Sequence, residues 1–139
     1  MLPGMGGERE KLGTVRVLLV EDDRASAMVV EGHLAAIASV QCEVRIATTL
    51  REAVAELRRT RFDLVIADLH LPDSLAQDTV PALMRACAYP IIALTVDESP
   101  ELRAQAVTAG AYDYLLKGQL ADGSLERPVR LAALQGRTL

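Results

Sequence analysis

Two kinds of hydrophobic pattern alternate along the chain. Short apolar runs, rich in valine, leucine and isoleucine, predict strands at residues 15–20, 43–47, 64–67, 91–94 and 112–116. After each of them, apolar residues near helical spacing predict helices at residues 24–38, 50–59, 79–88, 100–109 and 125–134. Residues 1–13 combine glycine with charge and lack periodicity, so we expect a flexible leader followed by one domain over residues 14–139.

Local signals mark several helix ends. Thr49 opens a capping-box sequence, and Ser99 followed by Pro100 has the form of an N-cap with proline at the first helical position. Gly110 is expected to end a helix as a C-cap glycine. Pro81 is expected in the first turn of its helix, where the missing N–H costs nothing.

Strict alternation of strand and helix requires parallel strands, right-handed crossovers and helices on both faces of the sheet. The predicted fold is therefore α/β, a doubly wound sandwich. Five strands favour the flavodoxin-like order 2-1-3-4-5 over the six-stranded dinucleotide fold. The sequence also contains neither a Gly-x-Gly-x-x-Gly motif after the first strand nor a Walker loop.

Composition narrows the range of functions. The net charge is −4 without a long basic stretch, which argues against direct nucleic-acid binding, and we read Arg58, Arg59 and Arg61 as cations favoured at a helix end. There is no apolar stretch long enough to span a bilayer, so we expect a cytoplasmic protein without membrane contact. Cys42 and Cys87 lack metal-type spacing and are expected to be free thiols.

Charged and hydroxyl side chains follow four of the predicted strands. Glu21 and Asp22 follow the first strand, Asp68 the third, Thr95 ends the fourth and Lys117 follows the fifth. All parallel strands end on one edge, and ligands bind where the strand order reverses, between strands one and three. We therefore expect the three carboxylates to converge there, with the threonine and the lysine beside them.

Three carboxylates in one cleft repel each other unless a cation lies among them, and oxygen ligands suit Mg²⁺ or Mn²⁺. Lys117 and Thr95 would then contact phosphate oxygens, which leaves Asp68 as the nucleophile. Taken singly, these residues have plainer explanations, since Thr95 could merely close a strand and Lys117 could be a surface lysine. For Asp23 we favour helix capping over metal binding.

Four sequence runs carry a resemblance to the receiver domains of bacterial two-component response regulators. They are LLVEDD at residues 18–23, LVIADLHLPD at 64–73, PIIALT at 90–95 and GAYDYLLK at 110–117. The runs occur in the family's order and spacing, and the similarity covers residues 14–134.

The resemblance implies that Asp68 accepts phosphate from a histidine kinase or a phosphotransfer protein. Glu21, Asp22, Asp68 and the backbone carbonyl of His70 would hold Mg²⁺. Self-phosphorylation from a donor and slow self-dephosphorylation would be the only chemistry, so the chain would be a signalling phosphoacceptor rather than an enzyme.

The resemblance also implies a switch. Thr95 would move toward the phosphate and Tyr114 would follow it inward, whereas an isolated Tyr114 would be read as a core-edge residue with its hydroxyl in water. The face formed by the fourth helix, fifth strand and fifth helix would then engage a downstream protein, an output domain or a second copy of the chain.

Some positions depart from the family pattern. Gly118 stands where proline usually follows the lysine, and Val96 stands where a small residue usually follows the threonine, so we expect slow loss of the phosphate. Gln77 replaces a common glycine and leaves residues 74–78 undefined, while the His70 side chain would either border the cleft or face solvent.

These departures keep a second hypothesis open, a phosphorylation-independent interaction module. A metal-dependent phosphatase is disfavoured because no acid lies two residues after Asp68.

Overall fold

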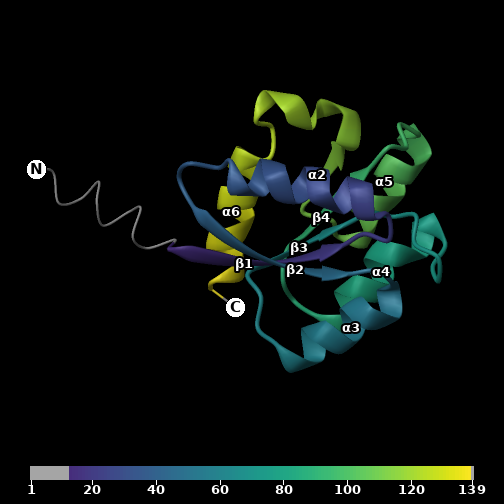
Figure 1. Cartoon of the computed structure of the whole chain (residues 1–139). Coiled ribbons are helices and arrows are strands. Elements are labelled where there is room, and N and C mark those ends of the chain that lie inside the picture. The colour runs from purple at the N-terminus through teal and green to yellow at the C-terminus, as the bar shows by residue number, and fades with distance from the viewer. Residues whose placement is uncertain (1–12, 139) are drawn as a thin grey trace, which may run out of the picture.

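The computed structural model describes residues 13–138, so the predicted leader lies, apart from Gly13, outside the described residues. Within them strands and helices alternate along the chain (Figure 1). The elements are β1 (Thr14–Val20), α2 (Arg24–Ala35), β2 (Gln41–Ala47), α3 (Leu50–Arg59), β3 (Leu64–Ala67), α4 (Ala76–Ala86), β4 (Ile91–Thr95), α5 (Pro100–Ala109), β5 (Asp113–Leu116), the 3₁₀ helix η1 (Lys117–Asp122) and α6 (Glu126–Gly136).

The five strands form one parallel sheet in the order β2-β1-β3-β4-β5, which confirms the predicted topology. In the register between the two central strands, Val20 lies beside Ala67. Glu21 follows Val20 in the chain, and Asp68 follows Ala67. The order reverses between β1 and β3, and the acids of both strands therefore leave the sheet side by side.

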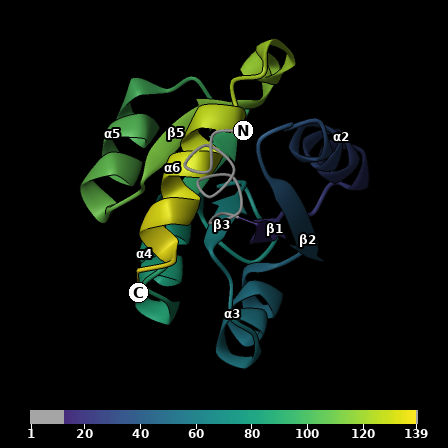
Figure 2. The ribbon, with the colours of Figure 1, turned by 90° about the vertical axis from the view of Figure 1, so that its left-hand side faces the viewer.

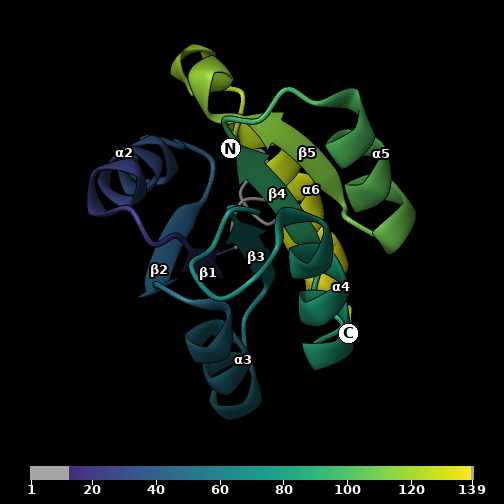
Figure 3. The same ribbon diagram turned by 90° about the vertical axis from the view of Figure 1, so that its right-hand side faces the viewer.

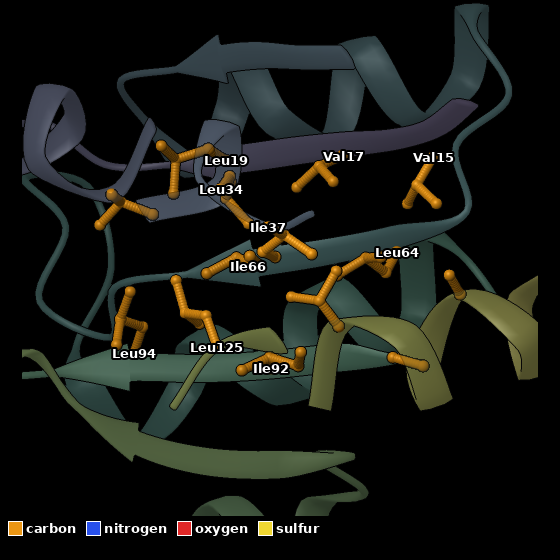
Figure 4. Packing of buried hydrophobic residues seen from close by; sticks show 14 of the residues in the cluster. Val15, Val17, Leu19, Leu34, Ile37, Leu64, Ile66, Ile92, Leu94 and Leu125 are labelled. Atoms are coloured by element: carbon orange, nitrogen blue, oxygen red, sulfur yellow. The ribbon is translucent and has the colours of Figure 1, made fainter. Parts of the chain in front are cut away.

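Helices cover both faces of the sheet. On one face α2 and α6 enclose a core built from both strand and helix residues. It includes Val17, Leu19, Leu34 and Ile66, which Figure 4 shows from close by. On the other face α3 and α4 pack against Leu18 and its neighbours, and α5 packs against Ala93 and Tyr114 (Figures 2 and 3). Burial of aliphatic side chains on both faces is the main stabilising contribution of this layered arrangement.

Several predicted boundaries were wrong. Helix α2 ends at Ala35 rather than near residue 38, because the chain must turn there, although Ile37 and Val40 still fill the core. Helix α4 begins at Ala76, three residues before the predicted start, and Pro81 consequently lies inside the helix rather than in its first turn. Its missing N–H leaves the carbonyl of Gln77, an exposed residue, without the usual helical partner.

The predicted caps of two helices are confirmed. Thr49 Oγ1 accepts a hydrogen bond from Glu52 N at 3.0 Å, and Ser99 Oγ accepts one from Leu102 N at 3.2 Å. Gly110 ends α5 in the left-handed conformation with φ of 109°. Local sequence is sufficient here because each cap depends on residues within one turn.

The end of α6 lies against the opposite edge of the sheet. The Cα of Gly136 comes so close to the Asp63 carbonyl that an added Cβ would overlap the oxygen. The guanidinium of Arg137 donates to Thr14 O and lies 3.6 Å from the Asp63 carboxylate. Glycine is required at position 136 by this close approach rather than by its backbone angles.

Candidate functional site

The carboxyl ends of β1 and β3 carry the acids into one place. Glu21 N donates to Ala47 O and Asp68 N donates to Val20 O, both at 2.9 Å, so the ladder of backbone hydrogen bonds continues one residue beyond each strand. Glu21 is 2% exposed and Asp68 7% exposed. The strands thus hold two carboxylates below the surface, where charge is costly without a partner.

Lys117 supplies that partner from the end of β5. Its Nζ donates to Asp68 Oδ2 at 2.7 Å and also contacts Glu21 Oε1. The side chain of Lys117 is itself largely covered by protein. Three strands therefore deliver one cation and two anions to a shared site, the arrangement expected from the sequence.

The electrostatics of this cluster follow from burial and contact. Burial raises the pKa of Glu21, and hydrogen bonds from Lys117 and from Asp23 N oppose that rise only in part. Burial by itself would lower the pKa of Lys117, but its hydrogen bonds to Asp68 and Glu21 raise the pKa above the ordinary 10.5. Lys117 is consequently charged at neutral pH.

Glu21, Asp22 and Asp68 together form a group that suits a divalent cation. One carboxylate oxygen from each lies within 4.8 Å of the others, and Asp22 is exposed. Hard oxygen donors with an open, solvent-facing side match the preference of Mg²⁺, which keeps part of its water shell. The donor set therefore fits the ion that the sequence suggested.

The neighbouring acid has the structural role that the sequence favoured. Asp23 Oδ2 accepts a hydrogen bond from Ser26 N at 2.9 Å and caps α2. Hydrogen bonds from the side chain and from the backbone N of Ser26 lower the pKa of Asp23. Asp23 N meanwhile donates to Glu21 Oε2 at 3.2 Å, so the start of α2 also orients the buried acid.

Thr95 and Tyr114 meet at the loop after β4. Thr95 is fully buried, and its Oγ1 accepts a hydrogen bond from Asp97 N at 3.2 Å. Tyr114 is 4% exposed, and its hydroxyl donates to Asp97 O at 2.7 Å rather than pointing into water. The guanidinium of Arg103 lies 4.9 Å from the centre of the Tyr114 ring.

Two loop aspartates contribute contacts that sequence reasoning missed. Asp97 Oδ2 lies 3.2 Å from His70 Nε2, so the half-exposed ring of His70 reaches the loop after β4. His70 N donates to Asp68 Oδ1 at 3.0 Å. Asp73 accepts hydrogen bonds from Leu50 N and Arg51 N in the first turn of α3. Neither the Asp97–His70 contact nor the contact between Asp73 and α3 can be predicted from the local sequence, because the partners are more than twenty residues apart.

A hollow of about 370 Å³ opens beside Lys117 between α2 and the loops after β4 and β5. Asp23, Val29, Val96 and Gly118 are among its lining residues. Val96 is 71% exposed, so its side chain stands at the entrance rather than in the core. Gly118 lies within η1, a helix that was not predicted and that carries the chain away from the site in place of the proline turn.

The sheet order, together with an acidic cluster at its reversal point and a strand-end lysine, defines a receiver-type signalling domain. The family model described as the response regulator receiver domain matches residues 17–127. The chain belongs to this family, whose members are signalling phosphoacceptors rather than classical enzymes.

Individual relatives agree with that assignment. The two-component response regulator ARR2 of Arabidopsis thaliana is 32% identical over 125 residues, which cover 87% of this chain and 17% of that protein. ORR23 of Oryza sativa subsp. indica, another two-component response regulator, is 36% identical over 107 residues, covering 74% of this chain and 15% of its own length. The chain thus spans no more than about a fifth of these curated relatives. They are plant proteins, so they support the receiver family but not the bacterial assignment.

Solved structures show the same fold. A signal receiver domain from Vibrio parahaemolyticus has a TM-score of 0.75 and 27% identity, covering 90% of this chain and 94% of that chain. A CheY-like receiver domain from Methanospirillum hungatei has a TM-score of 0.75 and 25% identity, covering 90% and 98%. Among residues 13–138, no helix is long and apolar enough to cross a membrane.

Proposed function

We propose that this chain is the phosphoacceptor of a two-component phosphorelay and that Asp68 receives the phosphoryl group. The observation that carries the proposal is the convergence of Glu21, Asp22, Asp68 and Lys117 from the ends of three strands. A phosphohistidine of a histidine kinase or phosphotransfer protein would be the donor. An oxygen of the Asp68 carboxylate forms the bond to phosphorus as the P–N bond of the donor breaks and the imidazole takes the bonding electrons.

The chain's own residues position this transfer. Hydrogen bonds from His70 N and Lys117 Nζ fix the two oxygens of Asp68 in place. After transfer, Lys117 and the hydroxyl of Thr95 would donate to phosphoryl oxygens. Glu21, Asp22, Asp68 and the carbonyl of His70 would hold Mg²⁺ or Mn²⁺, which when bound offsets the negative charge of the carboxylates and the incoming group.

Phosphorylation would act on the loop after β4. If Thr95 turns toward the phosphoryl group, the hydrogen bond from Asp97 N to its hydroxyl changes, and the same residue carries the carbonyl bonded by Tyr114. The change would reach the surface of α5, β5 and α6, where a downstream protein, an output domain or a second copy would bind. The free energy available to this switch is limited to the difference in contacts between the two states.

Incubation with acetyl phosphate and Mg²⁺, followed by intact-mass measurement, tests the proposal. We expect the wild-type chain to gain one phosphoryl group and Asp68→Asn to gain none. Asp23→Asn is the matched control, because Asp23 is the adjacent acid that caps α2. A chain that gains no phosphoryl group at Asp68 would refute the proposal and support the phosphorylation-independent interaction module instead.

A further inference from the structure

Asp73 holds the segment that follows Asp68 to helix α3, the helix that follows β2. Oδ1 of Asp73 accepts a hydrogen bond from Leu50 N at 2.8 Å, and Oδ2 accepts one from Arg51 N at 3.0 Å. Both donors belong to the first turn of α3, where backbone N–H groups lack helical partners and a negative charge is favoured. One carboxylate from the β3–α4 loop therefore caps the helix that follows β2.

This connection passes the end of the strand that carries the metal-binding acids. Strand β1 lies between β2 and β3 in the sheet, so a contact from the β3 loop to the start of α3 spans the carboxyl end of β1. Glu21 and Asp22 leave the sheet at that end. Glu21 N also donates to Ala47 O at the end of β2, and Asp68 N donates to Val20 O, so backbone hydrogen bonds join the same three strand ends.

The loop between Asp68 and Asp73 is short and closed by its own contacts. His70 N donates to Asp68 Oδ1, Ser74 N donates to Leu71 O at 3.3 Å, and the Leu71 side chain is buried with residues of β1 and α3. From the other side, Thr79 Oγ1 donates to Leu69 O at 2.8 Å. A displacement at Asp73 would therefore be transmitted to the backbone of His70, three residues away.

We infer that Asp73 is a positioning residue for the metal-dependent reaction, and that its contact with α3 holds the His70 carbonyl in place to complete the Mg²⁺ site. This inference rests on the proposed function. Asp73 does not contact the acids itself; it acts through the loop. The side chain is exposed, so its replacement leaves the core intact.

The chain offers a matched control for the stability of α3. Thr49 Oγ1 caps the same helix through Glu52 N but does not belong to the β3–α4 loop. Calorimetric titration of the full chain with MgCl₂, without any phosphodonor, should show about tenfold weaker binding for Asp73→Ala, the usual cost of losing support behind a metal ligand. Asp73→Asn keeps one acceptor oxygen and is expected to recover part of the affinity, while Thr49→Ala is expected to bind Mg²⁺ as the wild type does.

Thermal unfolding in EDTA provides the second measurement, and both alanine variants should lose melting temperature to a similar extent. Unchanged Mg²⁺ affinity in Asp73→Ala, or an equal loss in Thr49→Ala, would overturn the inference. If Asp73→Ala does not fold, the comparison between Asp73→Asn and Thr49→Ala decides in the same way. A wild-type chain that binds Mg²⁺ but accepts no phosphoryl group would refute the proposed function alone, and one that binds no Mg²⁺ would refute this inference as well.

Discussion

Replacing Lys117 by methionine should destabilise the metal-free protein and make its stability strongly dependent on Mg²⁺. The substitution keeps most of the aliphatic side chain but removes the cation that contacts both Glu21 and Asp68. Those two carboxylates are almost fully buried, and they would then face each other without a counter-charge. Mg²⁺ would neutralise the same oxygens, so it should replace the lost charge.

The size of the effect follows from burial. Removing one partner of a buried ion pair costs about 3 to 5 kcal/mol, and the partial exposure of Lys117 favours the lower end, about 3 kcal/mol. For a domain of this size that loss corresponds to a fall of about 10 °C in melting temperature. Protonating one carboxyl group relieves the repulsion and costs about 1.4 kcal/mol for each pH unit above its pKa, so the loss should shrink as the pH falls. Burial already raises the pKa of Glu21, which makes it the group that takes up the proton.

In the wild type the pH-dependent loss of stability falls at a much higher pH. Because contacts with Asp68 and Glu21 raise the pKa of Lys117 above 10.5, its stabilising contribution is complete below that pH and is lost as the pH rises through the raised value. The wild type should therefore show no Lys117-dependent change between pH 6 and pH 9. The methionine variant should instead gain stability as acidification approaches the raised pKa of Glu21.

Urea unfolding followed by circular dichroism measures these differences in EDTA and in saturating MgCl₂. Arg127→Met, an exposed cation on α6, is the control for loss of positive charge and should change little. An equal loss of unfolding free energy with and without Mg²⁺, or a loss that does not shrink at low pH, would show that Lys117 acts through packing and not through its charge.

Three further predictions concern other parts of the chain. Val96→Ala should shorten the half-life of the acyl phosphate, measured by intact mass after donor removal, because the exposed valine stands at the entrance to the site; an unchanged half-life would refute this role. Gly136→Ala should lower the free energy of unfolding by at least about 1 to 3 kcal/mol, since a Cβ would overlap the Asp63 carbonyl. Gly32→Ala, with open space around it in α2, should instead stabilise by about 0.5 to 1 kcal/mol, and similar effects for both glycines would contradict the packing. Tyr114→Phe removes the hydrogen bond to the loop after β4 and should cost about 1 kcal/mol in urea unfolding, and no loss would mean that the hydroxyl is equally well bonded by water.

Much of the fold follows from the sequence because its determinants are local. Hydrophobic period distinguishes the strands from the helices, and caps such as Ser99 and Gly110 depend on residues within one turn. The alternation of elements then allows only a few topologies, of which the observed order 2-1-3-4-5 is one. The positions of the acids at strand ends predict their convergence for the same reason.

Other features depend on chain segments that meet only in the folded protein. The start of α4 could not be predicted from residues 74–78, because Thr79 satisfies the Leu69 carbonyl across the loop and Pro81 is tolerated in the second turn. The glycine at position 118 does not predict η1. That helix forms in the folded protein with the Leu120 side chain buried in the core.

The sequence by itself determined that carboxylates from two central strands and a lysine from a third share one edge of a parallel sheet, because periodicity and strand order suffice to place strand ends. Only the tertiary structure decided what holds the loops around them. Asp73 caps a helix begun more than twenty residues earlier, and Asp97 meets His70 of the loop after β3 and Tyr114 of β5. The physical reason is that side-chain hydrogen bonds between loops depend on three-dimensional approach within about 3 Å, which no one-dimensional pattern records.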